Sequence, residues 1–404
     1  MTPSEQRLLI VCAADFAAPS EQQAFAIAQW VVANGGRAMI SIRGETASLN
    51  AQGFADAEHI EILPRGRLRG RAPDEYSRVC AFRPTAIYAF CPRPPVVAAA
   101  RRYKAVTGAP VFVHFEDNEW GLAVLPRTHS ASRRAAWTLL RAASSFLPEV
   151  YPRPTDASLT WVVAHAQALD ALTPALAREV TSRHERDCQM LLPVTARVAS
   201  MGTTQEQRSS DSDTTVLGFT GAVFGPHLPD YEILLKAIAE LQHRGQRIKL
   251  VHAGRLARRF DPARLAADAG VAPGTVDYRG QLPVRDARAI LNDVDVLVQP
   301  GAPSEFNRLR LPSKLQTYLA SGTPVITFAV GFGELLEHRV DAFLTRSGSP
   351  RELADAITTV VSDRDLNSCL AVGGPEAARR LFDTERNATQ LMRHLEENGE
   401  TGER

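Results

Sequence analysis

The strongest constraint on the fold is an alternation of short apolar runs with amphipathic segments that occurs twice along the 404-residue chain. Runs that are apolar throughout, such as residues 8–12 and 86–90, predict strands buried on both faces of a sheet. The amphipathic segments between them predict helices, and strand–helix–strand units build doubly wound parallel sheets. The same pattern restarts at residue 216. We therefore predict an α/β chain with two parallel sheets.

The apolar runs also predict where the strands lie. The expected strands are residues 8–12, 38–42, 60–63, 86–90, 110–114, 159–163, 190–192, 216–220, 248–253, 276–278, 294–299, 324–327 and 342–344. Ser20 is a candidate cap for the first helix, because its hydroxyl can accept from a free backbone N–H. Thr173 has the same role before a helix that begins at Pro174.

A polar segment divides the chain. Residues 199–213 are rich in Ser and Thr and lack periodicity, which is typical of a linker. We expect an N-terminal domain at residues 1–198 and a C-terminal domain at residues 214–375. The tail, residues 376–404, contains an amphipathic helix that is expected to pack back toward the first domain.

Composition argues against several classes of protein. The formal net charge is +1, so no overall field favours nucleic acid. The five cysteines and ten histidines show no metal-ligand or redox spacing, so we expect reduced thiols and no structural metal. The first residues lack the basic segment and long apolar run of a signal peptide, and no stretch is apolar enough to span a bilayer. These patterns predict a cytoplasmic protein.

The most informative stretch is residues 304–327, SEFNRLRLPSKLQTYLASGTPVIT. Apolar residues at helical spacing predict a helix that begins near Pro312 and ends at Gly322, followed by a buried strand. Lys314 lies in the first turn of that helix.

Two further cations, Arg308 and Arg310, lie close to the same helix start, and only Glu305 opposes them nearby in the sequence. A helix N-terminus is already positive, so a cation there is disfavoured unless an anion completes the site. A phosphate or diphosphate fits this pattern. The alternative is a solvated basic loop in front of an ordinary helix.

Acidic residues follow a strand in the first half, in residues 114–120, HFEDNEW. Open α/β sheets bind ligands at the carboxyl ends of their strands, so Asp117 and Glu119 are candidates for positioning an acceptor. The alternative is that Asp117 caps the next helix.

A basic amphipathic segment, residues 126–146, comes next, with arginines alternating with large apolar residues. It is typical of a peripheral membrane contact or an acceptor-holding surface, or of a surface helix that packs on the core.

The second half resembles the donor domain of retaining family 4 glycosyltransferases, which have the GT-B fold. The matching segments are LGFTGAVFG (217–225), KLVHAGR (249–255), VDYRGQLP (276–283), DVDVLVQPGAPSEFN (293–307), LPSKLQTYLASGTPVIT (311–327) and GFGELLEHRVDAFLT (331–345). The resemblance implies two facing Rossmann-like domains with parallel sheets. It also implies a nucleoside-diphosphate sugar held by the second domain, and a glycan, lipid-linked or small-molecule acceptor that enters from the first.

The resemblance further implies which residues hold the donor. It places diphosphate contacts at Ser313, Lys314 and the Gly221 loop, and base contacts near Gln281. The full set assigned to donor binding is Gly221, Gly225, Arg255, Gln281, Leu282, Glu305, Asn307, Arg308, Ser313, Thr317, Gly333 and Glu334.

The sequence departs from the family pattern in two places. The family's glutamates, separated by seven residues, are not both present: Thr317 stands at the second position, and Glu305 is offset from the first by an apparent insertion. The family's Arg and Lys after the first strand of this domain are also absent from residues 223–232, VFGPHLPDYE.

Two local motifs are weak. Asp293 and Asp295 imitate a metal-binding Asp-x-Asp, but they lead into a predicted buried strand. Gly331 and Gly333 lack the third glycine of a dinucleotide fingerprint. We therefore predict no metal and no cofactor, with the nucleotide sugar as a substrate.

Together these observations predict a metal-independent, retaining glycosyltransferase. The catalytic candidates are Lys314 and Arg310, which would stabilise the departing diphosphate, and Asp117 and Glu119, which would position the acceptor. The alternatives are a nucleotide-sugar epimerase or phosphorylase on the same scaffold, and a non-catalytic binding subunit that kept the fold and lost the glutamates.

Overall fold

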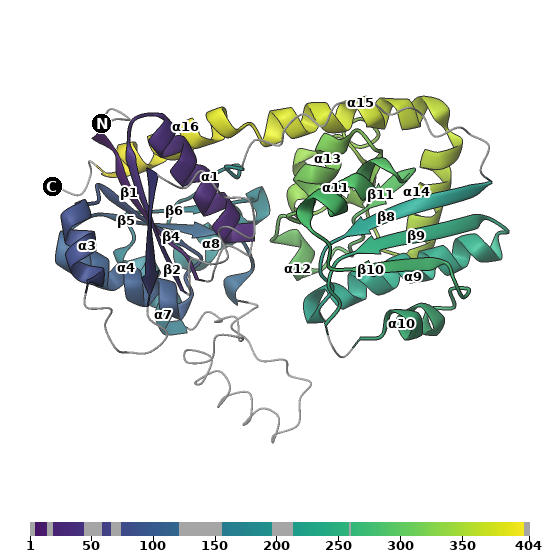
Figure 1. Cartoon of the computed structure of the whole chain (residues 1–404), viewed down its shortest axis with the longest axis horizontal. Helices are drawn as coiled ribbons and strands as arrows, with labels where there is room; N and C mark the ends of the chain where they lie inside the picture. The colour runs from purple at the N-terminus through teal and green to yellow at the C-terminus, as the bar shows by residue number, and fades with distance from the viewer. Residues whose placement is uncertain are drawn as a thin grey trace, which may run out of the picture. The chain divides into compact units, whose positions relative to one another are not determined.

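A computed structural model of the chain describes residues 5–13, 19–43, 59–65, 74–120, 156–195, 213–257 and 260–399. The chain divides into two compact units (Figure 1). The first comprises Met1–Arg197 and Asp383–Arg404, and the second comprises Val198–Phe382. The chain therefore leaves the first unit and returns to it at its end.

Within the described residues, seven parallel strands form the sheet of the first unit, in the order β3-β2-β1-β4-β5-β6-β7. They are β1 (Arg7–Val11), β2 (Arg37–Arg43), β3 (Ile60–Arg65), β4 (Ala86–Phe90), β5 (Val111–Phe115), β6 (Ala168–Ala171) and β7 (Cys188–Met190). Leu9 at the centre of β1 pairs with Met39 on one side and Ile87 on the other. The helices of this unit are α1 (Pro19–Ala33), α3 (Glu75–Phe82), α4 (Pro94–Thr107), α7 (Asp156–His165), α8 (Pro174–His184) and α16 (Thr384–Gly399).

Helix α16 completes the core of the first unit from the far end of the chain. Its Leu391 and Leu395 are buried in the same apolar cluster as Leu8 of β1. Asn387, which is 1% exposed, donates from Nδ2 to the carbonyl of Pro193 at 3.0 Å. The apolar stripe of α16 is therefore a structural part of the N-terminal unit.

This packing makes a prediction about stability. Leu391→Ala is expected to lower the free energy of unfolding of the first unit by about 2–5 kcal/mol, because it removes buried methyl groups and leaves a cavity. Denaturant unfolding followed by circular dichroism measures the change. The control is Arg393→Ala on the exposed face of the same helix, which should change stability by less than about 0.5 kcal/mol. Equal losses in the two variants would contradict the docking of α16.

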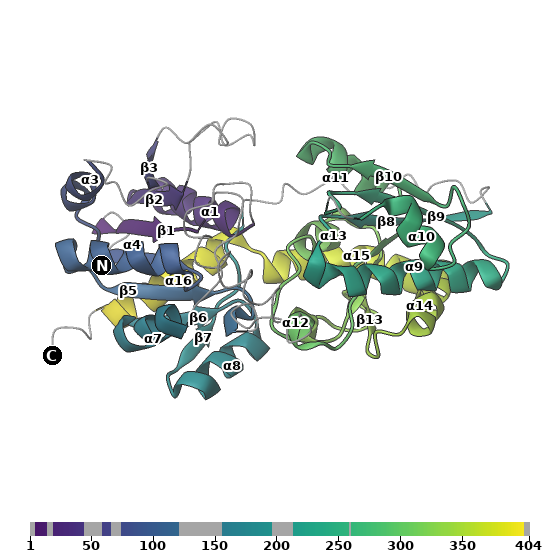
Figure 2. The ribbon, with the colours of Figure 1, turned by 90° about the horizontal axis from the view of Figure 1, so that it is seen from below.

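Among the described residues, the second unit has a six-stranded parallel sheet in the order β10-β9-β8-β11-β12-β13. Strands β8, β9, β10 and β13 are labelled in Figure 2. The strands are β8 (Thr214–Thr220), β9 (Arg247–Ala253), β10 (Val276–Gly280), β11 (Val296–Val298), β12 (Val325–Phe328) and β13 (Phe343–Thr345). The α-helices are α9 (Leu228–His243), α10 (Pro262–Asp268), α11 (Val284–Asn292), α12 (Glu305–Arg308), α13 (Leu315–Ser321), α14 (Pro350–Ser362) and α15 (Arg364–Leu381), with short 3₁₀ helices η3 (Gly225–His227) and η4 (Gly331–Leu335).

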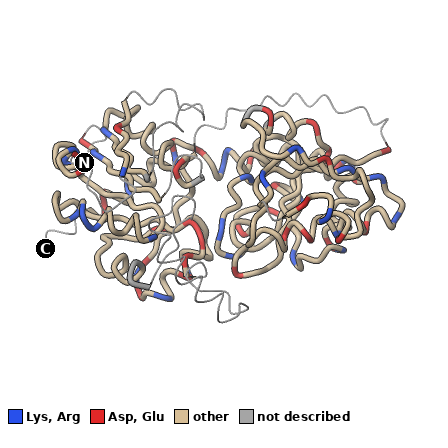
Figure 3. The backbone as a smooth tube through the Cα atoms, turned by 60° about the horizontal axis from the view of Figure 1, so that its bottom comes forward, with Lys and Arg blue, Asp and Glu red and all other residues tan. Residues whose placement is uncertain are grey.

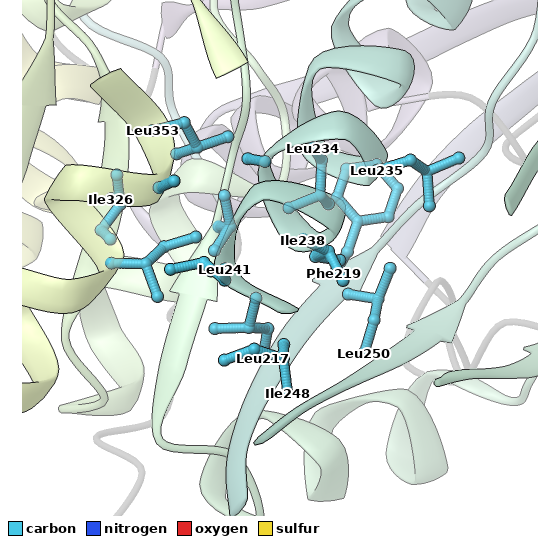
Figure 4. Close-up of a cluster of buried hydrophobic side chains, with 14 of the residues drawn as sticks. Leu217, Phe219, Leu234, Leu235, Ile238, Leu241, Ile248, Leu250, Ile326 and Leu353 are labelled. Carbon is cyan, nitrogen blue, oxygen red and sulfur yellow. The ribbon is translucent and has the colours of Figure 1, made fainter. Parts of the chain in front are cut away.

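Helices α9 and α14 pack against one another and against the second sheet. Figure 4 shows this core, in which Phe219 of β8, Ile238 of α9 and Leu353 of α14 belong to one buried cluster. Charged residues of both signs are spread over each unit (Figure 3), as the small net charge suggests. The packed cores form the scaffold, so we expect the functional residues in the loops that follow the strands.

The fold class predicted from the sequence is confirmed by the two parallel sheets. The predicted strand 86–90 matches β4 at both ends. The predicted strand 159–163 is wrong: these residues lie in α7, and the strand is β6, a few residues later. A short apolar run does not distinguish a strand from one side of a buried helix. Ser20 lies inside α1, which begins at Pro19, so it is not the cap of that helix.

Two predicted segments lie outside the described residues. They are the linker, residues 199–213 except for its last residue, and the basic segment 126–146. No helix in the described part of the chain is long and apolar enough to cross a membrane.

Candidate functional site

The predicted donor-binding residues of the second unit lie in the loops that follow its strands. The strand order reverses at β8, which has β9 on one side and β11 on the other. Open parallel sheets bind ligands at the carboxyl ends of their strands beside such a reversal. Here, that position is taken by the loop that starts at Gly221, directly after β8.

Gly221 and Lys314 are in direct contact although they lie far apart in the sequence. Gly221 has φ of +114°, and a Cβ built there would lie 3.0 Å from both Cε and Nζ of Lys314. The backbone and the end of the lysine side chain are therefore neighbours, and the positive φ favours a glycine at this position. The Lys314 ammonium also lies 3.8 Å from the centroid of the Phe219 ring, which is a cation–π contact.

The charge of Lys314 is poorly compensated. None of the described residues forms a hydrogen bond or an ion pair with its ammonium group, and burial together with the positive charge of Arg310 lowers the pKa of Lys314 to about 7. Asp230 acts in the opposite direction, but less strongly. Burial and the same two cations lower the pKa of His227 to about 3. An anion placed here would therefore meet an existing positive potential.

Arg310 is held inside the protein by a buried polar network. Its Nε and Nη2 donate to Asn307 Oδ1 at 2.9 and 2.7 Å, and its Nη2 lies 3.3 Å from Asp230 Oδ2. Asn307 Nδ2 in turn donates to both carboxylate oxygens of Asp230, at 3.0 and 3.1 Å. All three residues are at most 6% exposed. The guanidinium also lies 4.4 Å from the Phe306 ring centroid.

This network corrects one expectation from the sequence. Glu305 is not the only acidic residue that opposes the basic cluster, because Asp230 of α9 pairs with Arg310. Part of the charge that seemed to require a ligand is therefore balanced within the fold. Arg310 and Asn307 are buried beneath the site, and of the two cations Arg310 and Lys314 only Lys314 has no described ionic partner.

The helix of the basic stretch also differs from the prediction. It begins at Leu315 rather than near Pro312, and Lys314 is its N-cap residue. A short helix that was not predicted, α12, precedes it and is capped by Ser304, whose side chain accepts from Asn307 N. Helix α13 is tied to the Gly221 loop, because Tyr318 Oη accepts from Thr220 N at 2.6 Å.

The glycine loop after β12 lies beside α12. A Cβ at Gly331 would lie 2.5 Å from the Asn307 carbonyl, so the loop backbone packs directly on this helix. Gly333 lies in η4 with no room for a side chain, and Glu334 next to it is exposed. The structure thus brings the Gly333 loop to the same edge as Asn307.

The other predicted donor residues follow neighbouring strands or line the same stretch. Arg255 follows β9, and its exposed side chain has no described hydrogen-bond or ionic partner. Gln281 and Leu282 follow β10. The remaining predicted residues are Gly225 at the start of η3, exposed Glu305 and half-buried Arg308 in α12, exposed Ser313, and half-buried Thr317 in α13.

In the first unit, the two predicted acidic residues differ in environment. Glu119 is fully buried, with its carboxylate 3.1 and 3.3 Å from Nη2 and Nε of Arg93. Burial raises the pKa of Glu119, and Arg93 opposes this. The Asp117 side chain is 40% exposed and lies 3.9 Å from the same arginine. Of these two, only Asp117 presents its carboxylate to solvent.

The sequence did not indicate several residues that build the site. Asp230 looked like an ordinary acidic residue in the first turn of a helix, and Phe219 like a core residue. His252 was a polar residue near the carboxyl end of a predicted strand, which was the one available signal of a role beyond packing.

The two doubly wound parallel sheets define the class of fold, which is the GT-B fold of the solved structures described below. Residues 214–363, which lie in the second unit, match the family model Glycosyl transferases group 1. The prediction of a glycosyltransferase is thereby confirmed. The retaining family 4 assignment stays a prediction.

Solved structures agree with this fold. Anabaena HepE in complex with UDP and glucose has a TM-score of 0.66 and 16% identity over 96% of this chain and 99% of HepE. A glycosyltransferase from Rickettsia africae has a TM-score of 0.66 and 13% identity over 98% of both chains. TarM reaches a TM-score of 0.69 at 8% identity over 97% of this chain and 99% of TarM. At the level of sequence, no curated protein gives a significant match.

Proposed function

We propose that this protein transfers a sugar from a nucleoside-diphosphate sugar to an acceptor hydroxyl, with the donor's diphosphate bound between the Gly221 loop and Lys314. The observation that carries the proposal is the Lys314 ammonium, which touches Gly221, lies over Phe219 and has no described ionic partner. A half-buried cation without a counterion costs free energy, and a diphosphate would supply the missing charge.

In the proposed reaction, the bond between the anomeric carbon and the diphosphate oxygen breaks. A bond from that carbon to the acceptor oxygen forms, and the hydroxyl proton leaves with the diphosphate or to solvent. Negative charge grows on the diphosphate as this happens. A fixed cation aimed at that charge stabilises the transition state more than the ground state. Lys314 lies in position for this role. Arg310 acts indirectly, by holding Asn307 and thereby the glycine loop that packs against it.

The donor is most directly tested with UDP-sugars. HepE has been crystallised with UDP-glucose, and Staphylococcus aureus TarM with UDP. We extend this ligand class to the present chain because its second unit matches the model Glycosyl transferases group 1 and its fold is similar to that of HepE. On the first unit, we propose Asp117 as the residue that faces the acceptor, a glycan, lipid-linked or small-molecule alcohol.

Incubation of the purified protein with a panel of UDP- and GDP-sugars, with and without glycan and lipid-linked acceptors, tests the function. Release of the nucleoside diphosphate is expected for one donor, and faster release with a matching acceptor. The proposal includes retention of the anomeric configuration, which NMR of the product measures, and metal independence, for which the rate in EDTA should equal that with added Mg²⁺. No turnover of any donor would contradict the enzymatic proposal.

The lowered pKa of Lys314 makes a prediction about pH. Above pH 7, a growing fraction of this lysine is neutral in the free protein, and binding of UDP should draw a proton onto it. UDP affinity is therefore expected to fall as pH rises from 7 to 9. Calorimetry at pH 8 in buffers of different ionisation enthalpy should show proton uptake, which should disappear in Lys314→Ala. An uptake that persists in the variant would assign the proton to another group.

A further inference from the structure

His252 is a fully buried histidine that the mechanism above does not use. It lies next to the end of β9, and its ring is surrounded by those of Phe219, Tyr231 and Tyr278, with centroids 5.0, 5.0 and 5.1 Å away. Its two nitrogens have different partners. Nδ1 lies 3.0 Å from the Tyr231 hydroxyl, and Nε2 lies 3.2 Å from the carbonyl oxygen of Gly221.

These partners determine which nitrogen carries the proton. A backbone carbonyl can only accept, so Nε2 of His252 is the donor to Gly221. Burial lowers the pKa of His252 to about 4, so the ring is neutral near pH 7. Nδ1 is then an acceptor, and the Tyr231 hydroxyl donates to it. The ring is fixed in one tautomer and one orientation, with its N–H directed at the Gly221 carbonyl.

The orientation of that carbonyl determines the orientation of the next N–H. The peptide between Gly221 and Ala222 is planar and trans, so its C=O and N–H point in opposite directions. With the carbonyl held toward the buried His252, the Ala222 N–H points away from the core. Ala222 is exposed, and no described residue accepts a hydrogen bond from its N–H.

Further contacts keep this peptide in place. Gly221 N donates to the Ala253 carbonyl at 2.8 Å. A Cβ at Gly254 would lie 2.0 Å from the Gly221 oxygen, so only a glycine at this position leaves room for the carbonyl. Lys314 lies beside this loop, because its Nζ would be 3.0 Å from a Cβ at Gly221.

We propose that His252 is a positioning residue for the donor site: it holds the Gly221–Ala222 peptide so that the Ala222 N–H donates to the donor's diphosphate beside Lys314. This inference rests on the proposed function, because it assumes that the diphosphate binds at this loop. It adds a preorganised backbone donor to the site, which lacks the family's Arg and Lys in this loop. Preorganised N–H groups are effective donors because they need no reorientation when charge develops.

Titration calorimetry with UDP, and in parallel with GDP, tests the proposal in four variants. His252→Phe keeps the aromatic packing and removes the N–H, so UDP binding should weaken by about tenfold or more. His252→Gln places an amide N–H near the position of Nε2 and should restore affinity to within about threefold. Tyr231→Phe removes only the partner of Nδ1 and should leave affinity unchanged. Lys314→Ala reports on the diphosphate site itself.

Thermal unfolding of the same variants separates positioning from general stability. Both His252→Phe and Tyr231→Phe lose a buried hydrogen bond, so both should melt earlier, but only the first should lose UDP affinity. Affinity losses that follow the melting temperature in both variants would overturn the proposal. If His252→Phe does not fold, His252→Asn replaces it, because the shorter amide reaches the Tyr231 side and not Gly221.

The remaining outcomes distinguish this inference from the proposed function. If Lys314→Ala loses affinity and His252→Phe does not, the positioning role is wrong and the donor site stands. If the parent protein binds neither UDP nor GDP, the proposed donor site is wrong, and this inference is wrong as well. Support requires loss in His252→Phe with rescue in His252→Gln.

Discussion

Lys314→Ala is expected to weaken UDP binding by about 10- to 150-fold, because a charge-assisted contact of this kind contributes about 1.5–3 kcal/mol. Turnover should fall further than affinity, since the contact strengthens as charge accumulates on the departing diphosphate. Calorimetry and steady-state kinetics measure the two effects. The control is Lys236→Ala, an exposed lysine on α9 of the same unit, which should bind UDP as the parent does. Equal affinities of Lys314→Ala and the parent would refute the site.

The same variant should be at least as stable as the parent without ligand. The pKa of Lys314 is lowered to about 7 from its usual 10.5, so the folded state binds this proton less well than the unfolded state. The destabilisation is fully present below pH 7, shrinks as pH rises toward 10.5, and is absent above it. The thermal stabilisation by Lys314→Ala should therefore be larger at pH 6 than at pH 9. A loss of stability at pH 6 would show that the lysine supports the fold.

The second large effect is expected at Asp230. Asp230→Ala should lower the free energy of unfolding of the second unit by about 3–5 kcal/mol, because it leaves the buried Arg310 guanidinium without its carboxylate. Asp277→Ala is the matched control: its carboxylate pairs with Arg279 at 3.1 Å on the surface, where an ion pair contributes about 0–1 kcal/mol. Urea unfolding measures both.

Asp230→Ala should also disturb donor binding, because Asn307 loses both carboxylate acceptors. Replacing the pair together, with Asp230→Leu and Arg310→Met, should recover much of the stability, since a buried pair can be replaced by apolar side chains. The recovered protein should still bind UDP less well than the parent. Equal stability of Asp230→Ala and Asp277→Ala would contradict the structural role of the network.

The sequence predicted the fold well because parallel strands are short, apolar throughout and separated by helices. Strand β4 illustrates this, since its ends coincide with the ends of an apolar run. Helix α7 shows the limit of the same rule, because residues 159–163 are largely apolar and still form a helix. A local sequence pattern does not show which face of a sheet a segment packs against. For residues 159–163, this packing determined that the segment forms a helix.

The site was predictable in part. The basic stretch and the Gly221 loop could be located from local charge and glycine placement, and the structure brings Gly221 and Lys314 into contact. The pairing of Arg310 with Asp230 spans 80 residues, and the contact of His252 with Gly221 spans 31. Such contacts depend on how strands order themselves in the sheet, which single-residue patterns do not specify. These contacts are nonetheless decisive for the site, because they give Arg310 an ionic partner in Asp230 and leave Lys314 without a described one.

The return of the chain to its first unit has a consequence for synthesis. The core around β1 includes Leu391 and Leu395, which follow the whole second unit in the sequence. A domain usually folds as it emerges, N-terminal part first. Here the second unit is complete in sequence before α16 is made, so the apolar residues of the first unit that pack against α16 lack this partner until then. Chains truncated by a few turns of α16 are therefore expected to aggregate through the apolar residues of the first unit, which are synthesised first.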